Sequence, residues 1–234
     1  SASRNLALQK ATQPFIAFLD ADDFYLENRF EADKQLFESD TEVEGVYNAV
    51  GFHFYRNVTE KESRELDLYT INDIIQPYEL FENLLNGKCG DFHLNGLTFR
   101  KNVLDKTGYF NIKLQVAEDT DLQLKLALIC KLLPGNLTQA VALRGIHDTN
   151  IFNQENIYKQ YRFEMYESLI DFTLKNNLSK RKIDLLLNWL FYYRYKENYN
   201  LIAELKYWFC LLKSNPKLLT STLAIKYCPI IRKR

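Results

Sequence analysis

The sequence predicts an α/β domain followed by a helical region. In the first part of the chain, short apolar runs of strand-forming residues alternate with segments of helical periodicity, a pattern typical of α/β proteins. From residue 155 onward the periodicity is helical throughout. We therefore expect two domains, residues 1–150 and residues 151–234.

The composition is that of an ordinary folded protein. The chain has 234 residues, of which 47% are hydrophobic and 26% are charged. Its 30 basic and 30 acidic residues cancel, so no overall field favours binding to nucleic acid. The four cysteines lack C-x-x-C spacing, so we expect no zinc knuckle or redox motif. Scattered free thiols fit a reducing cytoplasm.

The spacing of apolar residues predicts the first elements. Residues 1–12 carry alanine and leucine at helical spacing, and the apolar run at residues 15–19 predicts a strand that ends at Asp20. Residues 26–39 predict an amphipathic helix. The valine, tyrosine and phenylalanine residues of 45–56 predict one long strand.

The middle of the chain is more varied. Residues 57–67 are charged and predict a loop, whereas residues 71–85 predict a helix bent at Pro77. Residues 93–100 fit either a strand or a loop that faces the substrate. Gly96 in this segment would let a ligand approach the backbone closely, or would simply permit a bend.

The last predicted strand comprises residues 139–146. Beyond it we expect four helices, at residues 155–176, 180–197, 199–214 and 216–227. Their aromatic residues, such as Trp189 and Trp208, are expected to pack a helical hairpin onto the α/β body.

The sharpest change from apolar to charged residues follows residue 19, where Asp20, Asp22 and Asp23 occur within four positions. A buried strand that ends in carboxylates delivers them to the edge of a sheet, where α/β proteins bind ligands. On an extended backbone Asp20 and Asp22 would point the same way, with Asp23 turned aside. Such oxygen ligands suit Mg²⁺ or Mn²⁺ that carries a substrate phosphate.

A second acidic pair, Glu118 and Asp119, precedes a helix whose Leu122, Leu126 and Ile129 share one face. The two carboxylates are therefore expected at a helix N-terminus, where the helix dipole favours their ionised form. Taken alone, the pair fits the simpler role of stabilising the helix.

Several segments occur in a specific order within the first 150 residues: Ser3-Arg4-Asn5, the strand and acids of 15–23, Gly108-Tyr109-Phe110, residues 118–122, and residues 144–147. In this combination the chain resembles family 2 glycosyltransferases of the GT-A fold. The resemblance implies a mixed sheet flanked by helices, a UDP- or GDP-sugar donor, a divalent metal (Mn²⁺ or Mg²⁺), and inversion at the anomeric carbon.

The resemblance also implies which residues bind the donor. Asp22 would ligate the metal, and His147 would supply a further contact to the metal or the pyrophosphate. Asp20 would lie beside the donor ribose or the metal. Arg4 and Asn5 would approach the donor nucleotide or its diphosphate, whose developing charge needs a metal clamp.

On the acceptor side, the resemblance implies that Asp119 is the general base and that Glu118 supports the acceptor hydroxyl. Gly96 is expected to contact the acceptor as well. Direct displacement needs a carboxylate next to the attacking hydroxyl, which is the role implied for Asp119.

The chain departs from the family in two respects. The first βαβ half, with the acid that binds the nucleotide base, is expected before Ser1, so the GT-A domain would be incomplete at its N-terminus. Residues 123–127 do not match the Gln-x-x-Arg-Trp motif of processive synthases. We therefore expect transfer of a single sugar onto a glycan or lipid-linked acceptor in polysaccharide or glycoconjugate biosynthesis.

Two other classes of function stay open. A non-catalytic remnant or interaction module would fit the missing donor half and the aromatic helical region. A nucleotidyltransferase would need a glycine-rich phosphate-binding signature. The basic residues at 226 and 232–234 add a lesser alternative, a peripheral contact of the C-terminal helices with the inner face of the membrane.

Overall fold

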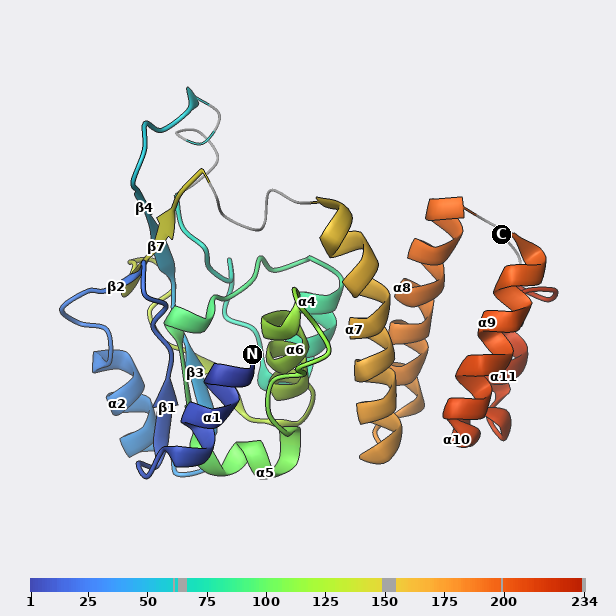
Figure 1. The fold of residues 1–234 in the computed structure, drawn as a ribbon. Coiled ribbons are helices and arrows are strands. Elements are labelled where there is room, and N and C mark those ends of the chain that lie inside the picture. Colours follow the sequence, from blue (N-terminus) through green and yellow to red (C-terminus); the bar gives the residue numbers. More distant parts are fainter. Residues whose placement is uncertain (61, 63–66, 149–154, 199, 233–234) are drawn as a thin grey trace. The chain divides into compact units, whose positions relative to one another are not determined.

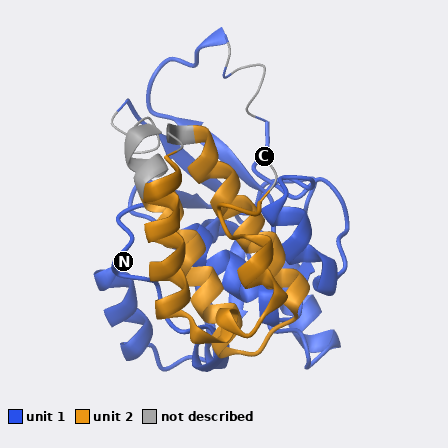
Figure 2. Ribbon diagram, turned by 90° about the vertical axis from the view of Figure 1, so that its right-hand side faces the viewer, with its two compact units in different colours: residues 1–155 blue, residues 156–234 orange. Residues whose placement is uncertain are grey.

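The computed structural model describes residues 1–60, 62, 67–148, 155–198 and 200–232 (Figure 1). The chain divides into two compact units, unit 1 (Ser1–Glu155) and unit 2 (Asn156–Arg234), coloured separately in Figure 2. The domain boundary expected between residues 150 and 151 lies outside the described residues.

Unit 1 combines helices with short strands, as an α/β domain should. Its helices are α1 (Ala2–Lys10), α2 (Glu31–Ser39), α4 (Pro77–Leu85), α5 (Leu104–Thr107) and α6 (Glu118–Ile129), with the 3₁₀ turns η1 (Leu94–Gly96) and η2 (Lys101–Val103). Its strands are β1 (Phe15–Ala17), β2 (Phe24–Tyr25), β3 (Gly45–Tyr47), β4 (Val50–Phe54), β5 (Leu97–Arg100), β6 (Leu132–Pro134) and β7 (Ala142–Ile146).

The central sheet has the strand order β1-β5-β3-β6. The β1–β5 and β5–β3 pairs are antiparallel, whereas β3 and β6 are parallel, so the sheet is mixed. Helix α2 packs on β3 through Phe37, Val43 and Val46, and Figure 1 shows α4 and α6 on the other side of the sheet. The predicted mixed sheet flanked by helices is confirmed.

A second sheet, of order β2-β7-β4, positions the acidic turn. Strand β2 begins directly after Asp23 and pairs with β7, whose last residue lies next to His147. The acids of 20–23 and the end of β7 are therefore neighbours in space, although more than a hundred residues separate them in the chain.

The single long strand predicted for residues 45–56 is wrong, because β3 and β4 belong to different sheets. The chain changes sheet at Asn48, whose buried side chain donates to Asp33 Oδ1 at 2.7 Å and to the Gly96 carbonyl at 3.0 Å. Its Oδ1 accepts a hydrogen bond from the Asn136 backbone at 2.8 Å. These bonds satisfy the buried amide of Asn48 where the chain passes from one sheet to the other.

Two predicted helices begin later than expected. Helix α2 begins at Glu31 instead of residue 26, because residues 26–29 form a turn that buries Arg29. Helix α4 begins at Pro77, so this proline starts the helix and does not bend it. Proline suits the first helical position, where a backbone N–H would have no intrahelical partner.

Unit 2 is helical, with α7 (Glu155–Lys175), α8 (Lys180–Asn198), α9 (Leu201–Ser214), α10 (Pro216–Leu219) and α11 (Thr222–Lys226). The predicted last helix is divided because Ser221 caps a new helix by accepting from Leu223 N at 3.1 Å. Phe191 contacts the rings of Trp208 and Tyr227, with centroids 5.6 and 5.7 Å away. In the described part of the chain, no helix has the length and apolar character needed to cross a bilayer.

We predict that Gly96→Ala destabilises the protein. A Cβ at this buried position would collide with the backbone oxygen of Asn48, which cannot move without disturbing both sheets. The free energy of unfolding measured in urea should fall by about 1–3 kcal/mol, the usual cost of overpacking a core. Gly87→Ala is the control: it has a φ of 62° but open space around it, so it should cost about 1 kcal/mol. A smaller loss for Gly96→Ala than for the control would contradict this account.

Candidate active site

The acids of 20–23 form a turn and not the end of a strand. Strand β1 ends at Ala17, and Asp23 N donates to Asp20 O at 3.1 Å. The expectation that Asp20 and Asp22 point the same way assumed an extended backbone and does not apply here. The two side chains have different partners: Asp20 accepts from Arg4, and Asp22 lies beside His147.

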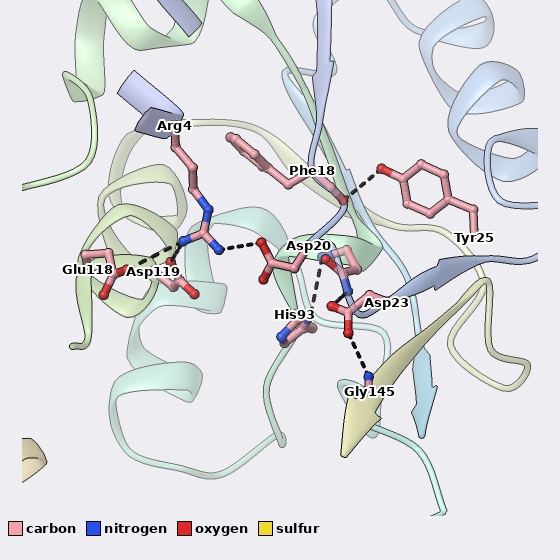
Figure 3. A network of polar contacts seen from close by, with 10 residues as sticks. Arg4, Phe18, Asp20, Asp23, Tyr25, His93, Glu118, Asp119 and Gly145 are labelled. Atoms are coloured by element: carbon pink, nitrogen blue, oxygen red, sulfur yellow. Dashed lines mark hydrogen bonds and ion pairs between the residues drawn. The ribbon is translucent and has the colours of Figure 1, made fainter. Parts of the chain in front are cut away.

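Arg4 joins the two acidic groups that the sequence singles out (Figure 3). From α1, its Nη2 donates to Asp20 Oδ1 at 2.6 Å, and its Nη1 donates to Asp119 Oδ1 at 3.0 Å. A longer contact of 3.5 Å reaches Glu118 Oε1. One guanidinium thus gathers three carboxylates from two segments that are about a hundred residues apart. These contacts define the candidate site.

Asp119 has an altered acidity within this cluster. It lies in the first turn of α6, which follows Ala117 in a left-handed backbone conformation (φ 64°). Burial raises the pKa of Asp119 to about 6, although 37% of its side chain is exposed. The negative charges of Glu118 and Asp20 also raise this pKa. Arg4 opposes this rise because its positive charge favours the ionised carboxylate.

Asn5 fixes α1 to the turn after α5. Its Nδ2 donates to the Phe110 carbonyl at 2.9 Å, and its Oδ1 accepts from Phe110 N at 3.0 Å. Both polar ends of the amide are therefore used within the protein. The predicted contact of Asn5 with the donor stays a prediction.

Asp22 and His147 meet at the end of β7, with 3.4 Å between Asp22 Oδ2 and His147 Nε2. The imidazole stacks on Tyr55 at 4.2 Å, and the Tyr55 hydroxyl donates to the Asp22 carbonyl at 3.1 Å. A carboxylate oxygen and an imidazole nitrogen are suitable ligands for Mn²⁺. Among the described residues no group of three or more His, Cys, Asp or Glu could hold a metal ion. The roles of Asp22 and His147 as metal ligands stay predictions.

Two residues near the site carry no sequence signal that we recognised, Tyr55 and His93. His93 Nδ1 accepts from Asn95 N at 3.3 Å, so its proton belongs on Nε2. Burial, together with the charge of Arg144, lowers the pKa of His93 to about 4, and the imidazole is neutral at physiological pH. Figure 3 shows it beside Asp20. The position of a histidine directly before a short polar turn could have marked it as a candidate site residue. Its burial, however, arises only from tertiary packing.

Gly96 is buried, and a Cβ added to it would collide with the Asn48 backbone oxygen and not point into open space. Glycine is needed here because the Asn48 backbone packs closely against this position. The predicted contact of Gly96 with the acceptor stays a prediction.

Comparison with solved structures identifies the fold. The chain matches S. aureus TarS 1–349 in complex with UDP-GlcNAc with a TM-score of 0.56 and 14% sequence identity, over 83% of this chain and 52% of that one. TarS 1–349 without the ligand gives a TM-score of 0.53 with 15% identity, over 84% of this chain and 51% of that one. The chain therefore has the GT-A fold predicted from the sequence, and it spans about half the length of these TarS chains.

Comparison with family models identifies the domain. Residues 1–108 match the model described as Glycosyl transferase family 2, so the chain carries a domain of this family there. The matched range includes Arg4 and the acids of 20–23, whereas Glu118, Asp119 and His147 lie beyond it. A comparison with curated proteins finds no match.

We predict that Arg4→Ala raises the pKa of Asp119 above its value of about 6. The guanidinium stabilises the ionised carboxylate, so its removal favours the protonated form. The carboxyl ¹³C signal of Asp119, followed by NMR as a function of pH, measures this shift. Lys10→Ala, an exposed substitution on the same helix, should leave the titration unchanged. A midpoint that falls in the Arg4 variant would contradict the proposed electrostatics.

Proposed function

We propose that this protein transfers a single sugar from a nucleotide-sugar donor to a glycan or lipid-linked acceptor, with inversion at the anomeric carbon and with the aid of Mn²⁺ or Mg²⁺. The observation that carries the proposal is the position of Arg4 between Asp20 and Asp119. A donor-side acid and an acceptor-side acid held by one cation leave the reacting groups of both substrates close together. That arrangement is what direct transfer requires.

On the donor side, Asp22 and His147 would hold the metal, and Asp20 and Arg4 would face the ribose and the diphosphate. When bound, the metal offsets the negative charge that the departing nucleoside diphosphate acquires. Arg4 can add to this stabilisation, because a guanidinium matches the geometry of a phosphate. Its present partners are only partly buried, so exchanging a carboxylate for a phosphate costs little.

On the acceptor side, Asp119 would accept the proton of the attacking hydroxyl. A bond forms between the acceptor oxygen and the anomeric carbon, while the bond from that carbon to the diphosphate oxygen breaks. The nucleoside diphosphate leaves with the bonding electron pair, and the proton moves to Asp119. Arg4 engages Oδ1 of this carboxylate, so Oδ2 is the oxygen that suits the proton.

The proposal extends to the class of donor. One structure with the same fold holds UDP-GlcNAc, which favours a UDP-sugar over a GDP-sugar as the first donor to test. A cytoplasmic location agrees with the supply of nucleotide sugars there. A non-catalytic module remains the competing proposal, and nucleotide binding distinguishes the two.

Unit 2 supports a peripheral contact with an anionic membrane surface. Helix α9 buries Trp208, Leu211 and Leu212 on one face. Its opposite face exposes Ile202 (67%) and Phe209 (65%) in line with the exposed Lys206 and Lys213. An apolar and cationic stripe of this kind suits the headgroup region of anionic lipids. Such a contact would bring the enzyme to a lipid-linked acceptor.

We predict that Asp119→Asn lowers the rate of transfer roughly 10²–10⁴-fold, the usual contribution of a general base. The amide keeps the shape of the side chain but cannot take the proton. Calorimetry with UDP and Mn²⁺ should show nearly unchanged donor binding, whereas the companion variant Asp22→Ala should lose it. Loss of folding in Asp119→Asn equal to its loss of activity would count against a catalytic role. No nucleotide binding by the native chain would favour the non-catalytic module.

We predict that Ile202→Ser/Phe209→Ser reduces the vesicle-bound fraction of the protein. Each large apolar side chain contributes roughly 1.5–3 kcal/mol when it is removed from water, so the partition coefficient should fall at least about tenfold. Sedimentation with phosphatidylcholine vesicles, with and without phosphatidylglycerol, measures this. Ile74→Ser/Tyr78→Ser removes large side chains of unit 1 that are even more exposed, and it should have no effect. Equal losses in both double variants would contradict a specific role for α9.

A further inference from the structure

Asp23 is a buried carboxylate directly behind the donor-side acids, and the proposed reaction makes no use of it. Only 8% of the residue is exposed. Its Oδ1 accepts a hydrogen bond from the Gly145 backbone N–H at 2.7 Å, and its Oδ2 accepts one from the Asn95 side-chain amide. Figure 3 shows this carboxylate turned toward β7, away from Arg4.

These bonds tie together three segments that border the candidate site. The first is the turn that contains Asp23 itself, closed by the bond from Asp23 N to Asp20 O. The second is η1, where the backbone N–H of Asn95 donates to His93 Nδ1. The third is the end of β7, which leads from Gly145 to His147. One side chain therefore connects the turn, the neutral histidine and the strand that carries the second candidate metal ligand.

The turn and the strand also touch through their backbones. A Cβ at Gly145 would collide with the Asp22 carbonyl oxygen, so only glycine permits this approach. The same carbonyl accepts from the Tyr55 hydroxyl, and Tyr55 stacks on His147. With the turn held against the strand in this way, Asp22 Oδ2 and His147 Nε2 lie 3.4 Å apart.

We propose that Asp23 is a positioning residue of this site: its carboxylate, bonded to Asn95 and Gly145, sets the separation of Asp22 and His147 and the orientation of His93. The inference rests on the proposed function for its catalytic consequence, but the geometry is independent of it. Residues that orient metal ligands typically contribute about 10–100-fold to metal affinity.

Two variants separate the bonds from the charge. Asp23→Asn can keep both hydrogen bonds, because Asn95 can rotate its amide and present Oδ1, which has no hydrogen-bond partner in the described protein. Asp23→Ala removes both bonds. Asp184→Asn serves as the control for the charge: Asp184 accepts from Lys226 and Tyr227 in unit 2, so this variant tests the loss of a well-bonded carboxylate charge elsewhere.

The experiment measures histidine signals in the free protein and UDP–Mn²⁺ affinity by calorimetry. We expect Asp23→Ala to change the ¹⁵N shifts of His93 and His147 and to weaken UDP–Mn²⁺ binding at least about tenfold. Asp23→Asn should lie between Asp23→Ala and the native protein, and Asp184→Asn should match the native protein in both readouts. Unchanged histidine shifts in a folded Asp23→Ala would overturn the inference. Should the native protein bind no UDP–Mn²⁺, the proposed function fails, while the histidine shifts still decide the role of Asp23.

Discussion

A buried charge must have its hydrogen bonds satisfied within the protein. Arg29, which bonds to the backbone of Asn95 next to the candidate site, is such a charge. The residue is 2% exposed. Its guanidinium donates to Asp33 at 2.8 Å, to the Asn95 carbonyl at 2.7 Å and to Thr98 at 3.2 Å, and it lies 5.3 Å from the ring centroid of Tyr25. Removing one partner of such a pair costs about 3–5 kcal/mol, because the other charge is left buried and unpaired. The backbone at Asn95 is therefore strongly constrained, and the bonds to Asp23 and β7 extend from it.

The ion pairs of Arg4 differ from the buried contacts of Arg29. They are partly exposed, and exposed pairs contribute only about 0–1 kcal/mol to stability. At that magnitude they add little to the stability of the fold, so Arg4 can exchange a carboxylate for a ligand at low cost. The buried bonds of Arg29 and Asn95 hold the turn that carries the acids. The partly exposed ion pairs of Arg4 can rearrange when a substrate binds. The proposed transfer would use both properties, because positioning requires a fixed framework and binding requires exchangeable contacts.

The sequence was most informative where a pattern is local. The helical spacing before residue 12, the apolar run of 15–19 and the acids that open α6 all reflect neighbours in the chain. The structure has a helix, a strand and a helix there, although the strand ends at Ala17 and not at Asp20. Strands β2 and β6, with two and three residues, are too short to show periodicity. The change of sheet at Asn48 was missed because the residues on both sides are apolar. The candidate site residues were recognised by type, but their contacts, such as Arg4 with Asp119, arise only from tertiary structure. Their roles are still predictions.

The acidity of Asp119 illustrates how tertiary structure decides what a local pattern leaves open. Its place in the first turn of α6 and the nearby Arg4 both favour the ionised carboxylate. Burial favours the protonated form, and so do the negative charges of Glu118 and Asp20. The net result is that the pKa of Asp119 rises to about 6. At neutral pH the group is then mostly ionised, yet it holds a proton more strongly than an exposed aspartate does. A proton acceptor is most effective when its pKa approaches the working pH, so the opposing effects bring Asp119 toward the acidity that the proposed reaction requires.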